Sequence, residues 1–219
     1  MDPLSNLRKN DYFCGVYKIR YDMKKILLTI AALLVTALSF AKVADELNPK
    51  YGKGAVPQDE NGAVYFDNTI DIPQNMNTDQ CYSMMLSWAK GRFAMPYAQA
   101  GRILNEDAET HRFIFHVDQT IVFKNTAFVV DQSRITYNFS VVVKDGKINM
   151  KMTDIKYRYE EGREGGAKIF TAEDWITDKE AYNSKGTKFL KSTGKFRVKT
   201  IDLKDLIFQS AFDAITGNL

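Results

Sequence analysis

The spacing of apolar residues predicts an α+β fold, in which one twisted antiparallel sheet carries helices on one face. Residues 79–93 repeat apolar side chains at helical spacing. Two long stretches alternate apolar and polar residues on either side of Asp145-Gly146. A second amphipathic helix is expected at the C-terminus, so the predicted order is strand, helix, several strands, helix.

The N-terminal region has the layout of a secretory signal. An apolar run, Ile26 to Phe40, follows Met23-Lys24-Lys25 and ends in small residues, so we expect cleavage after Ala41. We interpret residues 1–41 as this signal with an upstream mis-start, and Met23 as the true start. The run is shorter than the roughly 20 residues that span a bilayer. We therefore expect a periplasmic or secreted protein without a stable transmembrane span, with an uncleaved anchor as the alternative.

Removal of this signal changes the charge and the cysteine content. Residues 42–219 contain 24 basic and 24 acidic residues, because six of the 30 basic and three of the 27 acidic residues precede them. A neutral domain gives no global electrostatic support for nucleic-acid binding, so no nucleic-acid partner is expected. Cys81 is the sole remaining cysteine, which excludes an internal disulfide.

The first part of this domain is predicted to be a leader, a strand and a helix. Residues 42–62 contain three glycines and two prolines and are expected to form a flexible leader before a core of residues 63–160. Apolar residues in even register predict a strand that ends at Pro73. Asn77-Thr78 can cap a helix over residues 79–93. Its face of Cys81, Met85 and Trp88 either packs against the sheet or lines a pocket for an apolar ligand.

The middle of the chain reads as antiparallel strands. A short strand over 102–105 and a turn over 106–109 precede strands over 111–123 and 134–144. Asp145-Gly146 predicts a two-residue hairpin, which places Lys144 opposite Lys147 and Phe139 opposite Met152. After Met152 the apolar residues change parity, which predicts a bulge near Thr153-Asp154.

Residues 161–219 are expected to complete the same domain with a loop, an irregular stretch and a C-terminal helix. Gly217 can end that helix. Asp202 can cap its start, but a start near Phe189 is equally compatible with the pattern, because Gly194 interrupts it.

Two of these segments resemble a known family. They are the Trp-bearing helix of residues 79–88 and the hairpin of residues 139–149 (FSVVVKDGKIN), followed by Ile155-x-Tyr157. Over residues 60–160 they resemble the DUF4468 family of exported Bacteroidetes proteins, which implies a TBP-like fold. Family members usually have more arginine and tyrosine after the turn than Ile148-Asn149-Met150. The family has no established activity and implies no catalytic residues.

Candidate chemistry is sparse in this sequence. His111 and His116 have opposite parity along one strand, so they cannot share a metal, and we expect no metal or other cofactor. Cys81 lies in an apolar pattern and is expected to be buried. The basic segment 185–204 could face anionic lipid or another polyanion, complement the acidic segment 160–180 or remain solvated.

The remaining candidate is the sheet face that the helices leave open. We expect it to display Arg112, His116, Asp118, Asn138, Ser140, Asn149 and Lys151, together with Tyr157 and Tyr159 after the parity change. Such a polar and aromatic surface is typical of a binding face, and also of a solvated sheet. The leading hypothesis is therefore a non-catalytic envelope binding or structural module for a protein or glycan. The alternatives are a periplasmic carrier of a small apolar ligand and an enzyme that uses Cys81.

Overall fold

The computed structural model describes residues 48–160 and 166–217. The predicted signal segment, with its start at Met23 and its cut after Ala41, lies outside these residues. No helix in the described ranges is long and apolar enough to cross a membrane.

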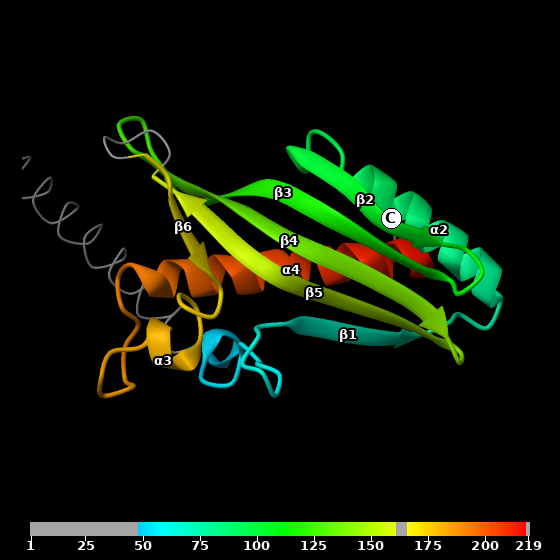
Figure 1. Cartoon of the computed structure of the whole chain (residues 1–219), viewed down its shortest axis with the longest axis horizontal. Helices are drawn as coiled ribbons and strands as arrows, with labels where there is room; N and C mark the ends of the chain where they lie inside the picture. Colours follow the sequence, from blue (N-terminus) through cyan, green and yellow to red (C-terminus); the bar gives the residue numbers. More distant parts are fainter. Residues whose placement is uncertain (1–47, 161–165, 218–219) are drawn as a thin grey trace, which may run out of the picture. The chain divides into compact units, whose positions relative to one another are not determined.

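The described residues form one antiparallel sheet with two long helices on one face, which confirms the predicted α+β class (Figure 1). The hydrogen-bonded order is β1-β5-β4-β3-β2, and β6 also pairs with β5. The elements are the 3₁₀ turn η1 (Pro49–Tyr51), β1 (Phe66–Asp71), α2 (Thr78–Arg92), β2 (Ala100–Asp107), β3 (Arg112–Asn125), β4 (Val130–Lys144), β5 (Lys147–Tyr159), β6 (Lys168–Thr171), α3 (Asp178–Ala181) and α4 (Thr193–Thr216).

Helix α2 begins as the sequence predicts. The Asn77 side chain accepts a hydrogen bond from the Gln80 amide, and the Gln80 side chain accepts one from the Asn77 amide, at 2.9 and 3.0 Å. This capping box satisfies two amides that a helix start otherwise leaves unpaired. Cys81, Met85 and Ala89 are then buried against the sheet.

The β4–β5 hairpin has the predicted register. Lys144 lies opposite Lys147, and Phe139 lies opposite Met152. The turn residues Asp145 and Gly146 have φ of 54° and 74°, which a two-residue hairpin turn of this kind requires. The predicted bulge is also present, because the register shifts between Thr136 and Asn138, opposite Asp154 at φ 52°.

Two boundaries differ from the sequence-based expectation. Strand β2 runs from Ala100 to Asp107 rather than over 102–105, because pairing with β3 holds polar residues in the extended conformation. Helix α4 begins at Thr193, where Gly194 fits closely against Phe189: a Cβ on Gly194 would lie 2.5 Å from the Cβ of Phe189. Asp202 therefore lies inside α4, where it accepts hydrogen bonds from other parts of the chain instead of capping.

The expected flexible leader is partly packed against the domain, with Tyr51 and Val56 buried. The reason is Arg197 of α4, whose side chain is fully buried. Its Nε and Nη1 donate to the carbonyls of Tyr51 and Ile176 at 2.8 Å, and its Nη2 donates to the Gly52 carbonyl. Nη2 also makes an ionic contact of 2.7 Å with Asp178. One guanidinium thus joins η1, the segment before α3, and α4.

We expect Arg197→Ala to lower the free energy of unfolding by about 3–5 kcal/mol, because three buried carbonyls lose their donor. Urea denaturation followed by tryptophan fluorescence measures this change. Lys191→Ala, at an exposed position just before α4, is the control and should stay within about 0.5 kcal/mol of the parent chain. Equal stability of the two variants would contradict the role given to Arg197.

The bulge predicts a second stability difference. Asp154→Val should destabilise the fold by about 1–2 kcal/mol, because a β-branched residue is strained at positive φ. Asp154→Gly should be close to neutral, since it relieves that strain and loses only an exposed ion pair with Lys156. Thermal denaturation of both variants checks the difference, and a valine variant as stable as the glycine variant would contradict it.

Candidate functional site

The candidate site is the face of the sheet that points away from α2 and α4. Figure 1 looks onto this face, with α4 running behind the strands. Cross-strand pairing brings His116 of β3 beside Asn138 of β4, and Ser140 of β4 beside Lys151 of β5. We call the side chains that these strands project away from the helices the open face.

Two polar pairs join β3 to β4 on the open face. His116 Nδ1 lies 2.9 Å from Asn138 Oδ1 and donates this hydrogen bond, because an amide oxygen can only accept. Arg134 donates to both carboxylate oxygens of Asp118, with Nε at 3.0 Å from Oδ1. This bidentate geometry is the one that guanidinium and carboxylate groups favour.

A second group lies toward β5 and β1. Lys151 Nζ is 4.5 Å from the centroid of the Tyr65 ring, close enough for a cation–π contact. Asn149 accepts a hydrogen bond of 2.9 Å from Thr69 on β1. Arg112 is exposed opposite Val142. Seven of the nine residues proposed from the sequence therefore share the open face.

The other two, Tyr157 and Tyr159, lie on the covered face, which corrects the sequence-based assignment. Tyr157 is fully buried with its hydroxyl 2.7 Å from Thr200 Oγ1, and burial raises the pKa of this phenol. Tyr159 donates to Asp131 at 2.8 Å. The bulge at Asp154 explains both positions. It inserts one extra residue into β5, so the odd-numbered residues before the bulge lie on the open face, whereas the odd-numbered residues Tyr157 and Tyr159 after it lie on the covered face.

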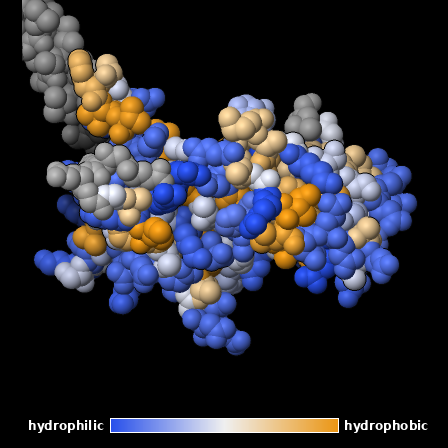
Figure 2. Space-filling model, turned by 45° about the horizontal axis from the view of Figure 1, so that its top comes forward, coloured by the Kyte–Doolittle hydropathy of each residue, from blue (hydrophilic) through white to orange (hydrophobic). Residues whose placement is uncertain are grey.

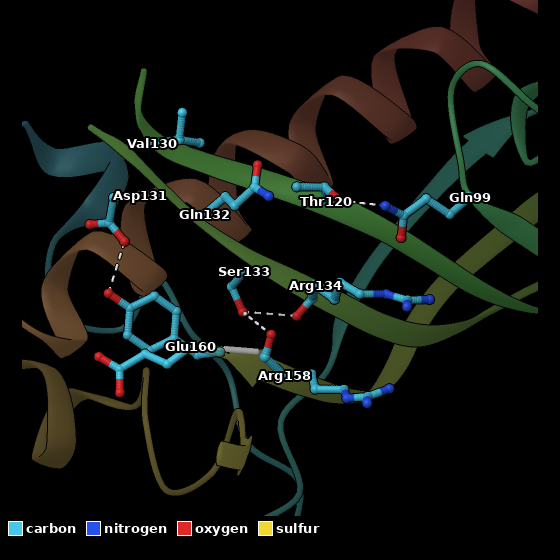
Figure 3. A pocket seen from close by; sticks show the side chains of 10 residues that line it. Gln99, Thr120, Val130, Asp131, Gln132, Ser133, Arg134, Arg158 and Glu160 are labelled. Atoms are coloured by element: carbon cyan, nitrogen blue, oxygen red, sulfur yellow. Dashed lines mark hydrogen bonds between the residues drawn. The ribbon is translucent and has the colours of Figure 1, made fainter. Parts of the chain in front are cut away.

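A polar cleft at the end of β3, β4 and β5 went unrecognised in the sequence (Figure 3). Its volume is about 360 Å³, and its lining includes Gln99, Thr120, Arg134 and Arg158. Arg134 and Arg158 are cross-strand neighbours and extend side by side. Strand parity is a signal that could have placed Arg134 on the open face, whereas Arg158 can be placed there only with the one-residue shift at the bulge.

Basic side chains outnumber acidic ones on the open face. Strand pairing places these basic residues there: Arg102, Arg112, Arg134, Lys144, Lys147, Lys151, Lys156 and Arg158. The acidic residues are Asp67, Asp71, Asp107, Asp118 and, paired with Lys156, Asp154. Residues 42–219 have equal numbers of basic and acidic residues, but the basic ones are in excess on the open face, so this face is electropositive.

The interface between α2 and the sheet is closely packed where the carrier hypothesis requires a cavity. Met85 is fully buried, and the Trp88 ring lies 5.7 Å from that of Phe139, centroid to centroid. Trp88 also donates a 3.0 Å hydrogen bond to Ser210 of α4. Met84 points outward and is exposed. This packing counts against a ligand held between the helix and the sheet, whereas Met84 and Trp88 line an apolar groove of about 650 Å³ on the side of α2 that faces α4.

Cys81 and the histidines also have defined environments. Cys81 is fully buried, and burial raises the pKa of its thiol, which lowers the fraction of reactive thiolate. His111 contacts Asp79 of α2 at 2.5 Å, whereas His116 lies on the open face, so the two imidazoles lie on opposite faces as predicted. Within the described ranges no cluster of three His, Cys, Asp or Glu side chains could hold a metal ion.

The basic segment 185–204 is partly internal. Arg197 contacts Asp178 of the acidic segment, and Lys195 Nζ lies 2.6 Å from Asp131. The first of these pairs favours the interpretation in which the basic and acidic segments complement each other.

Comparisons with known proteins agree with this architecture. Residues 66–158 match a family model described as a domain of unknown function, DUF4468, with a TBP-like fold. A crystal structure of a DUF4468 family protein from Bacteroides ovatus is similar with 30% identity and a TM-score of 0.68, over 76% of this chain and 93% of that one. A TBP-like protein from Parabacteroides distasonis shares the fold at 19% identity and a TM-score of 0.60, over 74% and 97% of the two chains. No curated protein matches the chain.

The burial of Cys81 predicts resistance to alkylation. In the folded protein we expect iodoacetamide to modify Cys81 on the order of 10³-fold more slowly than in denaturant, because reaction requires opening of the core. Mass spectrometry of the peptide that contains Cys81 measures the rate, and the denatured chain is the control. Rapid modification of the folded protein would restore Cys81 as a candidate nucleophile.

Proposed function

The chain belongs to the DUF4468 family, whose function is unknown, and from this premise we propose that it is an exported, non-catalytic binding module of the cell envelope. The signal-like segment before Ala41 supports export to the periplasm or beyond. The open face supports binding, because it offers polar side chains at fixed spacing on a rigid sheet.

The partner we propose is a protein with an acidic surface. The observation that carries this proposal is the excess of basic residues on the open face, including Arg112 and Lys151. Opposite charge on a partner accelerates association and selects against basic competitors. A glycan partner loses support, because Tyr157 and Tyr159 lie on the covered face and leave fewer aromatic rings for stacking.

The same geometry gives less support to the two alternatives. A Cys81 nucleophile would need access and a lowered pKa, whereas this thiol is buried and its pKa is raised. A carrier of a small apolar ligand would need an enclosed space beneath α2, where Met85 is packed against the sheet; the apolar groove at Met84 and Trp88 lies between α2 and α4 instead.

We expect Lys151→Glu to weaken binding of an acidic envelope partner by about tenfold or more, because it places like charges across the interface. Co-purification from an envelope fraction, followed by titration of the recovered partner, measures the change. Lys191→Glu is the matched control, since it makes the same charge change outside the sheet. His116→Ala should weaken binding less. Unchanged affinity of both open-face variants would refute this surface as the binding site.

Native mass spectrometry of the protein from the same fraction separates the proposal from the carrier alternative. A second polypeptide in the complex is the expected result. A reproducible extra mass of a few hundred daltons would instead favour the carrier and direct attention to the helix–sheet interface.

A further inference from the structure

The β3–β4 hairpin ends in a group of exposed apolar side chains, beyond the polar residues of the open face. Phe128 is 97% exposed, and Val129 and Val130 are 47% and 60% exposed. Val122 lies near them on β3 and is 42% exposed. We call these four residues the apolar tip. In Figure 2 an orange patch at the upper left marks the end of this hairpin.

The hairpin extends past its neighbouring strands. Strand β2 pairs with β3 only as far as Asp118, and β5 pairs with β4 only from Ser133 onward. Residues 122–132 therefore pair only with each other. Phe123 and Asp131 at the base of this ribbon still contact Tyr159 of β5 and residues of α4. No other described strand pairs with the end of this ribbon, and its Val130 also lines the polar cleft beside Arg134.

The backbone of the turn is largely satisfied within the turn itself. The Thr126 amide donates to the Val129 carbonyl at 2.9 Å, and the Val129 amide donates to the Thr126 carbonyl at 3.3 Å. A segment can enter an apolar layer at low cost only when its backbone groups are already paired. The turn that carries Phe128 meets much of this requirement.

The charges beside the tip suit a membrane surface. Lys124 is exposed two residues before Thr126. The nearest acidic residue along the hairpin, Asp131, is engaged by Lys195 at 2.6 Å and by the Tyr159 hydroxyl at 2.8 Å, which reduces its repulsion of anionic groups. Basic side chains next to exposed aromatic and aliphatic ones are typical of segments that bind the lipid interface.

We propose that the apolar tip inserts into the surface of a lipid bilayer and holds the domain at the membrane. A protein partner fits this feature less well, because specific protein interfaces bury about 800 Å² on each side and place anchors in concave pockets. The end of this ribbon offers only a few exposed apolar side chains. Shallow insertion of a phenylalanine and neighbouring valines needs no complementary pocket.

The test uses the full chain with Phe128→Trp and vesicles of neutral lipid, or of neutral and anionic lipid mixed, with brominated acyl chains. We expect the emission of the introduced tryptophan to shift to the blue and to be quenched by the brominated chains, a change that the parent chain lacks. Binding should be tighter to the anionic vesicles. Leu190→Trp is the control, because Leu190 is exposed outside the hairpin and should show no added quenching. This local readout distinguishes tip insertion from binding by the apolar run near the N-terminus.

A second set of variants measures the contribution of the valines. Val129→Ser and Val130→Ser, added to the Phe128→Trp chain, should raise the lipid concentration that gives half-maximal quenching by about tenfold or more. Lys151→Glu, added to the same chain, should leave the quenching by neutral vesicles unchanged, which separates this inference from the proposed open-face function.

Two results would overturn the inference. One is unquenched emission from the tryptophan introduced at position 128 in the presence of vesicles, with circular dichroism confirming a folded protein. The other is loss of a protein partner, without any change in lipid quenching, when the valines of the tip are replaced.

Discussion

The pairing of β4 with β5 is the constraint on which the other features depend. Asp145 and Gly146 both adopt positive φ, so the turn permits one register, and that register places the apolar residues of both strands on one face. A slip by one residue would expose this whole set to solvent. The bulge at Asp154 then corrects a parity change that would otherwise turn Ile155 and Tyr157 outward. The two faces of the sheet are thereby distinguished: one takes the helices, and the other remains polar.

The covered face is completed by contacts between distant parts of the chain. Helix α2 contributes Met85 and Ala89, and α4 crosses the same face with Phe196 and Ile207. Arg197 then joins α4 to the segment at Tyr51 and to the segment before α3 through buried hydrogen bonds. A buried guanidinium is costly to desolvate, and it is tolerated because carbonyl oxygens and Asp178 surround it. Stability and shape at this end of the domain depend on that one side chain.

The open face has a different energetic character. Its ion pairs, such as Lys147 with Asp71, are exposed and contribute little to folding, about 0–1 kcal/mol each. Their positions are nevertheless fixed by the strands that carry them, so a partner meets a surface that is already organised. The apolar tip lies at one end of the same sheet. A domain held to a membrane by the tip would still present most of its electropositive face, which makes the two proposed surfaces compatible.

The sequence by itself determined the fold class, the α2 cap, the β4–β5 register, the bulge and seven residues of the open face. These features follow from local rules: residues alternate between the faces of a strand, Asp-Gly favours one turn, and Asn is a favoured residue at a helix N-cap. Tertiary structure alone decided the start of α4, the packing of the segment after Pro49, the covered positions of Tyr157 and Tyr159, and the cleft at Arg158. The physical reason is that each depends on partners distant in the sequence. Arg197 meets carbonyls of Tyr51 and Gly52 only after folding. Likewise, the side of the sheet on which Tyr157 lies depends on how many residues the bulge inserts opposite Tyr137, and residue type does not encode that number.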